Sequence, residues 1–265
     1  MDAIDRIQEQ FGRNAGKYAT SQVHAQGESL GRLVELTQPQ AQWLALDVAT
    51  GAGHTALAFA PLVRHVWAVD LTMPMLLVTR KLARERGLSD VSLAQMEAAH
   101  FPFAEESFDL ITCRIAPHHF EDVGGFMREA ARTLRPGGKL AVADNIAPGS
   151  RLRGKKGKRE RDAGIYVNAI EKLRDPSHNR CLSLDEWLEL FQQAGLGSIQ
   201  YETLSKRIDF DEWAARMGVA GADLTRLRVL FVQAPHAAAE FLQPQWTGNR
   251  LNFLLWEAVV VGTKS

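Results

Sequence analysis

The sequence predicts an α/β fold with a doubly wound, mostly parallel sheet. From Trp43 onward, short apolar runs alternate with helical segments at the spacing of βαβ units. The first of these runs, Leu-Ala-Leu-Asp-Val-Ala at 44–49, is almost continuously apolar. That composition is expected of a strand buried on both faces, which is the usual position of strands in a parallel sheet.

The composition excludes several classes of protein. The chain has 265 residues, 46% of them apolar, with 31 basic and 31 acidic residues. This neutral balance argues against a dedicated nucleic-acid binder. No segment reaches the roughly 18 apolar residues of a membrane span, and residues 1–14 do not resemble a secretory signal. We therefore expect no integral membrane association. Two cysteines cannot build a disulfide framework, so we also expect a cytoplasmic protein.

The elements can be justified in order along the chain. Residues 1–37 are expected to be helical, because apolar residues recur there at three- and four-residue spacing. Arg135-Pro136-Gly137-Gly138 predicts a turn between a helix and a strand, since proline ends helices and glycine accepts positive φ. Up to Asn145, strands are predicted at 43–49, 66–69, 91–95, 109–114 and 139–145, with helices at 54–62, 73–86 and 124–134.

The chain changes character after Asn145. Residues 147–162 contain three glycines, a proline and a basic run, which predicts an excursion or a lid. Ser183 and Glu186 form a capping box that begins a helix over 183–194. The stretch 210–242 is expected to be helical, and 199–208 and 251–262 are predicted strands that close the sheet.

A glycine loop between a strand and a helix is the sharpest local pattern. Gly51 and Gly53 let a ligand approach the backbone, and the helix after them offers unpaired N–H groups. Asp70 ends the next strand, 19 residues after Gly51, where an acid can hold a pair of ribose hydroxyls. Together these features predict a site for a nucleoside cofactor.

NAD and S-adenosylmethionine both suit this geometry. Asp47 stands just ahead of the turn, where a carboxylate would repel a pyrophosphate but suit a cationic sulfonium cofactor. None of the three tyrosines has a lysine four residues later, so the Tyr-x-x-x-Lys pair of short-chain reductases is missing. A nicotinamide-dependent oxidoreductase and a non-catalytic cofactor-binding module nevertheless stay open as alternatives.

Four segments now point to one family: LDVATGAG (46–53), AVD (68–70), QMEAAHFPFAEESFDLITCR (95–114) and LRPGGKL (134–140). With them the chain resembles the class I S-adenosylmethionine-dependent methyltransferases, in particular the branch similar to ubiquinone/menaquinone C-methyltransferases and small-molecule methyltransferases. The likeness covers residues 10–148, and EKLRDPSH at 171–178 resembles a segment of some bacterial members. It implies a Rossmann-like, seven-stranded sheet with an antiparallel last strand, N-terminal helices and a lid insertion.

The resemblance also implies a set of cofactor-binding residues. Asp70 matches the ribose-binding acid, while Leu71 and Met75 would flank the adenine or simply pack in the core. Glu97 stands where relatives usually have aspartate. Many relatives have glycine in place of Ala49, and alanine fits there without strain only if its φ is negative. The complete set is Tyr18, His24, Asp47, Ala49, Thr50, Gly51, Gly53, Asp70, Leu71, Met75, Glu97, Ala98 and Arg114.

The residues for methyl transfer should lie beyond the carboxyl ends of the strands. His118 and His119 are the expected catalytic residues, because histidine titrates near neutral pH, and His119 is favoured. Asp144, Asn145 and His178 are candidates for substrate contact. The alternative for each is a local structural role, such as a helix cap or a satisfied turn. We expect no bound metal.

A basic run at 151–161 contains seven basic residues and one acid. Without it the chain carries 24 basic and 30 acidic residues, so the neutral total hides an acidic body. The run is either a solvated loop or a mobile lid with a local anion site beside the mouth of the active site. RNA methylation rests on this run alone, and we expect no nucleic-acid partner.

The expected activity is therefore in-line methyl transfer from S-adenosylmethionine to a small-molecule acceptor. The acceptor and its reacting atom stay open, as does the oligomeric state, for which a homodimer is one option. We expect a single methyltransferase domain over 1–265. Its parts are a helical cap (1–40), a cofactor-binding core (41–146), a lid or insertion (147–182) and the C-terminal half of the sheet (183–265).

Overall fold

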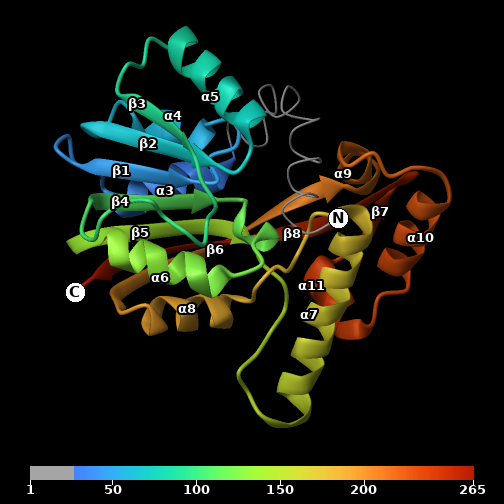
Figure 1. Ribbon diagram of the computed structural model, residues 1–265. Coiled ribbons are helices and arrows are strands. Elements are labelled where there is room, and N and C mark those ends of the chain that lie inside the picture. Colours follow the sequence, from blue (N-terminus) through green and yellow to red (C-terminus); the bar gives the residue numbers. More distant parts are fainter. Residues whose placement is uncertain (1–26) are drawn as a thin grey trace.

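A mixed sheet forms the centre of the molecule in the computed structural model, which describes residues 27–265 (Figure 1). Its strand order is β3-β2-β1-β4-β5-β8-β6, and a short β7 pairs with β8. β1 to β5 run parallel, whereas β8 is antiparallel to both β5 and β6. The strands are β1 Leu44–Val48, β2 His65–Asp70, β3 Val91–Gln95, β4 Phe108–Arg114, β5 Leu134–Asn145, β6 Leu196–Asp209, β7 Gln245–Thr247 and β8 Arg250–Lys264. The predicted fold class and its antiparallel last strand are confirmed.

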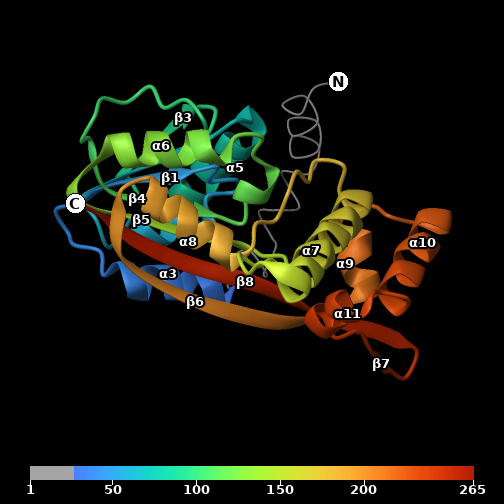
Figure 2. The same ribbon diagram turned by 90° about the horizontal axis from the view of Figure 1, so that it is seen from below.

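Helices cover both faces of this sheet. α3 and α4 pack on one face, and α6 and α8 pack on the other, which is the doubly wound arrangement. Figure 2 shows α3 and α6 on opposite sides of the sheet. The helices are α3 Glu28–Thr37, α4 His54–Phe59, α5 Met73–Glu85, the short 3₁₀ turn η1 Pro117–His119, α6 Val123–Thr133, α7 Gly154–Arg174, α8 Leu184–Gln193, α9 Phe210–Arg216, α10 Gly221–Val232 and α11 His236–Leu242. The helical segment expected before Gly27 lies outside the described residues.

The strands alternate their side chains between the two faces. In β1, Leu46 and Val48 lie in the core that contacts α6 and α8, whereas Ala45 lies in the core that contacts α3 and α4. Because both faces are covered, the whole strand except Asp47 is apolar, as the sequence pattern predicted.

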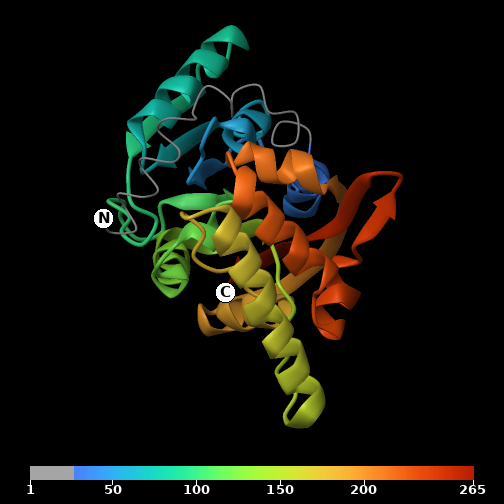
Figure 3. The same cartoon turned by 90° about the vertical axis from the view of Figure 1, so that its right-hand side faces the viewer.

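A third hydrophobic core lies beside the sheet. α7, α9, α10 and α11 pack around a cluster of aromatic side chains that includes Phe210, Trp213, Phe231 and Phe253 (Figures 1 and 3). Phe253 comes from β8, so this group of helices is anchored on the sheet by the long antiparallel strand. Within residues 27–265, no helix is both long and apolar enough to cross a membrane.

Two local predictions need comment. Ser183 caps α8 in a complete capping box with Glu186, as predicted. The expected turn at 135–138 is wrong, because β5 begins at Leu134 and continues through those residues. The register with β4 shifts between Phe108 and Leu110, and Gly137 has a φ of 78°. Leu134 pairs with Phe108 and Lys139 with Leu110, so the residues of β5 between these two pairs form a bulge that keeps the chain in the sheet.

Candidate active site

A cavity of about 270 Å³ opens at the carboxyl ends of β1, β2 and β4. This is the position at which ligands bind in open parallel sheets. The volume lies just below the range of about 300–1,000 Å³ that small-molecule sites usually have. The predicted site residues that line it are Ala49, Thr50, Gly51, Asp70, Leu71, Met75, Glu97, Ala98, Arg114 and His119.

The glycine loop is packed on one side and open on the other. Gly53 has a φ of 85°, and a Cβ there would lie 2.5 Å from Cγ2 of Thr79 on α5. Gly51 has a φ of 55°, and a Cβ there would have nothing within 4 Å. Thr79 Oγ1 also donates a hydrogen bond to the Gly51 carbonyl at 2.8 Å. Gly53 therefore serves the packing of the turn, whereas Gly51 faces the cavity.

Asp47 braces the same turn from below. Its carboxylate accepts hydrogen bonds from the Thr50 hydroxyl at 2.6 Å, the Ala56 N–H at 3.1 Å and the Thr112 hydroxyl at 2.7 Å. Burial raises the pKa of Asp47 to about 6, although these hydrogen bonds and the charge of Arg114 lower it. Asp47 does not line the cavity, so it can favour a cationic ligand only through its field and not by contact.

Asp70 links the loop to the next strand at the cavity wall. Its Oδ2 accepts the Gly51 N–H at 2.8 Å, and its Oδ1 accepts the N–H and hydroxyl of Thr72 at 2.9 and 2.7 Å. Burial raises the pKa of Asp70, while these hydrogen bonds lower it. A carboxylate has about four lone-pair sites, so a ligand hydroxyl can still be accepted.

Two residues without the freedom of glycine take left-handed backbone conformations at the cavity. Ala49 has a φ of 53° and Ile115 a φ of 52°, and both line the cavity. An unstrained alanine at position 49 required a negative φ, and this condition is not met. The Ile115 N–H donates to the Ala143 carbonyl at 2.8 Å, which fixes this end of β4 against β5. Such strain is tolerated where surrounding contacts enforce it, often beside binding sites.

The cavity wall beyond Asp70 is mostly apolar. Met75 is buried, and Leu71 and Ala98 line the same wall. Glu97 lies at the open side, with its carboxylate 3.3 Å from Nδ1 of His100. An apolar wall with a polar group at its edge is the usual arrangement for a heterocyclic ring.

Arg114 brings a positive charge to the cavity. Its Nε donates to the Thr55 hydroxyl at 3.1 Å. Burial lowers the pKa of Arg114, whereas the carboxylates of Glu257 and Asp47 raise it. The guanidinium of arginine stays protonated even when buried, so Arg114 can bind an anionic group of a ligand.

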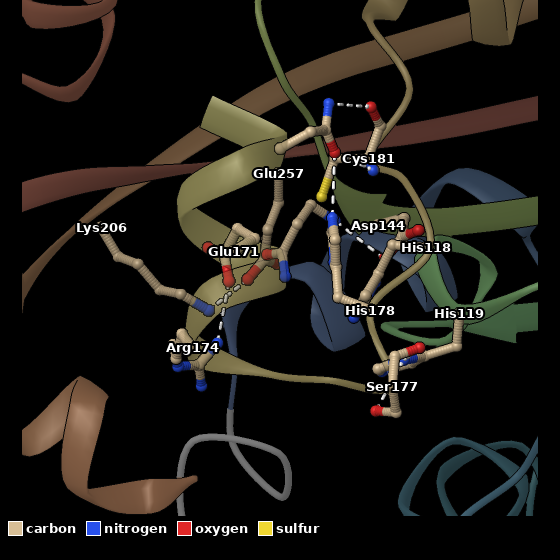
Figure 4. Close-up of polar contacts among 12 residues, drawn as sticks. His118, His119, Asp144, Glu171, Arg174, Ser177, His178, Cys181, Lys206 and Glu257 are labelled. Carbon is tan, nitrogen blue, oxygen red and sulfur yellow. Dashed lines mark hydrogen bonds and ion pairs between the residues drawn. The ribbon is translucent and has the colours of Figure 1, made fainter. Parts of the chain in front are cut away.

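The two adjacent histidines have different roles in the structure. Their side chains are neighbours (Figure 4), with the ring centroids 4.2 Å apart. His119 lines the cavity, whereas His118 does not. His118 Nδ1 lies 2.6 Å from Oδ1 of the buried Asp144. Burial lowers the pKa of His118, but the carboxylates of Asp144, Glu171 and Asp175 together outweigh it, so the pKa lies above the ordinary value for histidine. Burial and the neighbouring charge of His118 lower the pKa of His119.

Other predicted residues lie behind the cavity. Asp144, Asn145 and His178 are not part of its lining, and His178 Nε2 lies 2.9 Å from Oδ1 of Asn168. Tyr18 and His24 fall outside the described residues. Three further predicted residues do not line the cavity but contact residues around it, as described above. They are Asp47, Gly53 and His118. In the described part of the chain, no group of three or more His, Cys, Asp or Glu side chains is placed to hold a metal ion.

The basic run lies away from the cavity. Residues 154–161 form the first turns of α7, and no residue of 151–161 lines the cavity. α7 has 21 residues and is therefore about 30 Å long, and this end of it points away from the sheet (Figure 1). The expected position beside the active-site mouth is wrong, because the segment begins α7 and points away from the sheet instead of folding over it.

Several lining residues had not been predicted. His54 and Thr55 begin α4, and Phe120, Glu121 and Asp122 continue the loop after His119. Their common feature is that they continue a βα connection in which a residue had already been chosen. Extending the candidate set through the whole of each βα loop would have found them.

The sheet order and the glycine-loop cavity are those of a methyltransferase, and a family model described as a methyltransferase domain matches residues 46–142. The uncharacterized methyltransferase YcgJ of Bacillus subtilis is 34% identical over 96% of this chain and 97% of its own length. A crystal structure of YcgJ aligns with a TM-score of 0.81 at 33% identity, covering 89% of this chain and 97% of that one.

Two further relatives agree with this assignment. The structure of a putative methyltransferase from Bacillus halodurans aligns with a TM-score of 0.82 at 32% identity, covering 90% and 99% of the two chains. A demethylmenaquinone methyltransferase of Thermus thermophilus is 36% identical over 44% of this chain and 54% of its own length. The chain therefore belongs to the S-adenosylmethionine-dependent methyltransferases, and the resemblance stated from its sequence is confirmed.

Proposed function

We propose that the cavity binds S-adenosylmethionine and transfers its methyl group to a small-molecule acceptor. One observation carries this proposal: the glycine loop is open at Gly51, directly beside the buried carboxylate of Asp70. A loop without a side chain lets the methionine part approach the backbone, and a carboxylate at the end of the neighbouring strand can accept the ribose hydroxyls. The residues present therefore fit this cofactor.

The other lining residues have complementary roles in this proposal. Leu71 and Met75 supply the apolar wall for adenine, and Glu97 lies at its edge. Arg114 can pair with the carboxylate of the methionine part. When bound, the cofactor supplies an activated methyl group on a sulfonium. The chain then needs mainly to align the acceptor with that methyl group and to exclude water.

The cavity also supports a small acceptor. Its volume of about 270 Å³ leaves little room beyond the cofactor, which favours a small acceptor. A nucleic-acid substrate would need a basic surface at the mouth of the cavity. The basic run of residues 151–161 does not line the cavity, which favours the small molecule.

Calorimetry with the purified chain tests this proposal. We expect S-adenosylhomocysteine to bind and NADPH not to bind. Asp70→Ala should weaken the binding of S-adenosylhomocysteine by about 1.5–3 kcal/mol, because a hydrogen bond to a charged group is lost. Asp70→Asn keeps the shape but removes the charge, and Asp90→Asn, on an exposed aspartate outside the cavity, is the matched control. If NADPH binds and S-adenosylhomocysteine does not, the proposal is contradicted and the oxidoreductase alternative is favoured.

A further inference from the structure

Two charged residues of α6, Glu129 and Arg132, bind the stretch of chain that follows one wall of the cavity. Residues 96–100 line the cavity, and they lie between β3 and β4 in a stretch that forms neither helix nor strand. The backbone N–H and C=O groups of such a stretch need partners from other parts of the molecule. Phe101 and Phe103, which come just after the wall, find these partners on α6.

Three backbone groups bind the two side chains. Oε2 of Glu129 accepts the Phe101 N–H at 2.9 Å. Nη2 of Arg132 donates to the Phe101 carbonyl at 3.2 Å, and its Nη1 donates to the Phe103 carbonyl at 2.9 Å. The same guanidinium donates to both carboxylate oxygens of Glu129, at 2.9 Å from Nε and 2.8 Å from Nη2. Glu129 and Arg132 therefore act as one unit, which we call the α6 clamp.

The α6 clamp has the geometry of a strong ion pair. The side chains of Glu129 and Arg132 are only 22% and 31% exposed. The hydrogen bond from Arg132 lowers the pKa of Glu129, burial opposes this, and the Phe101 N–H lowers the pKa further. A planar guanidinium that donates two N–H groups to a carboxylate has a fixed orientation, which a lysine cannot reproduce. The clamp therefore holds the backbone at Phe101 in a defined position.

α6 also packs directly against the cavity wall. Phe101 is buried, and its ring centroid lies 6.4 Å from that of Phe126 on α6. A Cβ on Gly125 would lie 3.2 Å from Cβ of Ala99, which itself lines the cavity. Neither residue of the α6 clamp lines the cavity, so the clamp can influence a ligand only through this wall.

We propose that Glu129 and Arg132 are positioning residues that keep the wall of residues 96–100 in the shape that receives the cofactor. This inference rests on the proposed function, in which Glu97 lies at the edge of the adenine site. Without the clamp, the wall populates other conformations, and a ligand binds only the fraction of molecules in the competent one. The clamp thus raises the affinity by preorganisation and not by contact.

A second pair of an arginine and a carboxylate provides a matched control. Arg135 Nη1 donates to Oδ2 of Asp109 at 2.7 Å, and its Nε donates to the Glu106 carbonyl at 3.1 Å. Oδ2 of Asp109 also accepts the Leu44 N–H at 2.7 Å. This pair has the same chemistry, but it lies at the amino ends of β1 and β4, whereas the cavity lies at their carboxyl ends. Its loss should cost stability without reaching the cavity.

Hydrogen exchange in the ligand-free protein tests whether the clamp holds the wall. In Arg132→Ala, the Phe101 and Phe103 carbonyls lose their donor and Glu129 loses its orientation. We therefore expect the amides of residues 96–103 to exchange about tenfold faster or more, which peptide mass spectrometry measures. Arg135→Ala should leave these amides at the wild-type rate.

Calorimetry with S-adenosylhomocysteine, together with urea unfolding, separates positioning from stability. We expect Glu129→Ala and Arg132→Ala each to weaken binding about tenfold, and the double variant to bind no more weakly, because the pair acts as one unit. Glu129→Gln should recover part of the affinity, since its amide oxygen can still accept the Phe101 N–H. Arg135→Ala should lower the free energy of unfolding to a similar extent but keep the wild-type affinity.

Three results would overturn this inference. They are wild-type affinity in both alanine variants of the clamp, an equal loss of affinity in Arg135→Ala, and unchanged exchange of residues 96–103 in Arg132→Ala. Failure of the proposed function is distinguishable, because the wild-type protein itself then does not bind S-adenosylhomocysteine while the exchange result still holds. If Arg132→Ala does not fold, Arg132→Lys keeps the charge but loses the planar fork and gives the same test.

Discussion

Single residues around the glycine loop divide into those that shape the turn and those that leave space for a ligand. Gly53 has Thr79 against the position of its missing side chain, whereas Gly51 has open space there. Asp47 and Asp70 then brace the two ends of the turn through backbone N–H groups. The loop is held by contacts that do not need the cofactor, so its shape is present before binding.

This division predicts that two similar substitutions affect stability and binding to different degrees. Gly53→Ala should cost roughly 2–4 kcal/mol of stability, because it combines positive φ with overpacking against Thr79. Gly51→Ala should cost about 1–2 kcal/mol, through backbone strain alone, but should weaken binding of S-adenosylhomocysteine. Urea unfolding and calorimetry measure the two quantities. A Gly51→Ala protein that binds as tightly as wild type would show that this face does not contact the cofactor.

Ala49 gives a second test at the residue scale. Its φ of 53° costs an L-residue about 1–2 kcal/mol, while glycine loses about 0.5–1 kcal/mol of chain entropy on folding. Ala49→Gly should therefore raise the free energy of unfolding by up to about 1.5 kcal/mol or leave it unchanged. Chemical denaturation checks the sign, and clear destabilisation would mean that the alanine methyl group contributes packing that outweighs the strain.

At the scale of elements, α8 shows how local chemistry fixes a helix end. The Ser183 hydroxyl accepts the Glu186 N–H at 3.3 Å, and Glu186 accepts the Ser183 N–H at 2.8 Å. The helix so begun places Trp187 and Phe191 in the core of the sheet. The start of this helix is thus fixed by two residues, and its orientation by two large side chains.

The capping box of α8 can be tested by one substitution. Ser183→Ala should lower the free energy of unfolding by about 1 kcal/mol, since a helix N–H loses its partner. Ser89→Ala removes an exposed hydroxyl outside any helix start and serves as the control. Thermal unfolding of both proteins gives the comparison, and equal melting temperatures would mean that packing of Trp187 alone sets the helix start.

At the scale of the whole molecule, buried ionisable groups gather where the sheet meets the neighbouring helices. Asp144 of β5 pairs with His118, and Glu171 of α7 pairs with Arg174. Figure 4 shows these pairs and His178 between α7 and the strands. α7 also packs on α10 and α11, so these buried groups form a polar layer next to the aromatic core of those helices.

This layer predicts how stability depends on pH. Burial and the charge of His118 lower the pKa of His178 to about 2, and the pKa of His119 is lowered as well. A lowered histidine pKa contributes stability above the unfolded value of about 6.5 and loses it as the pH falls. The raised pKa values of His118 and Asp47 act in the opposite direction, with stability lost as the pH rises.

We expect the two lowered histidines to dominate, so that the free energy of unfolding falls as the pH drops from about 6.5 to 4. His178→Gln keeps a donor for Oδ1 of Asn168 but cannot take up a proton, so it should flatten this dependence. Urea unfolding at several pH values measures it. An unchanged slope in His178→Gln would contradict a buried neutral histidine at this position.

The sequence by itself determined the order of strands and helices, the glycine loop and the acid at Asp70. These features depend on hydrophobic periodicity, turn chemistry and short spacings, which act over a few residues or one βαβ unit. The sequence also placed Ser183 correctly at a helix start, because a capping box is complete within four residues.

Only the tertiary structure decided how these parts meet. It turned Asp47 from a ligand contact into a brace, gave Ala49 a positive φ, and selected His119 over His118 for the cavity. It also brought Ser177 to His119 across 58 positions of the chain. Such contacts follow from how the sheet and helices pack, and no local pattern encodes which side of a residue faces a cavity and which faces a distant loop.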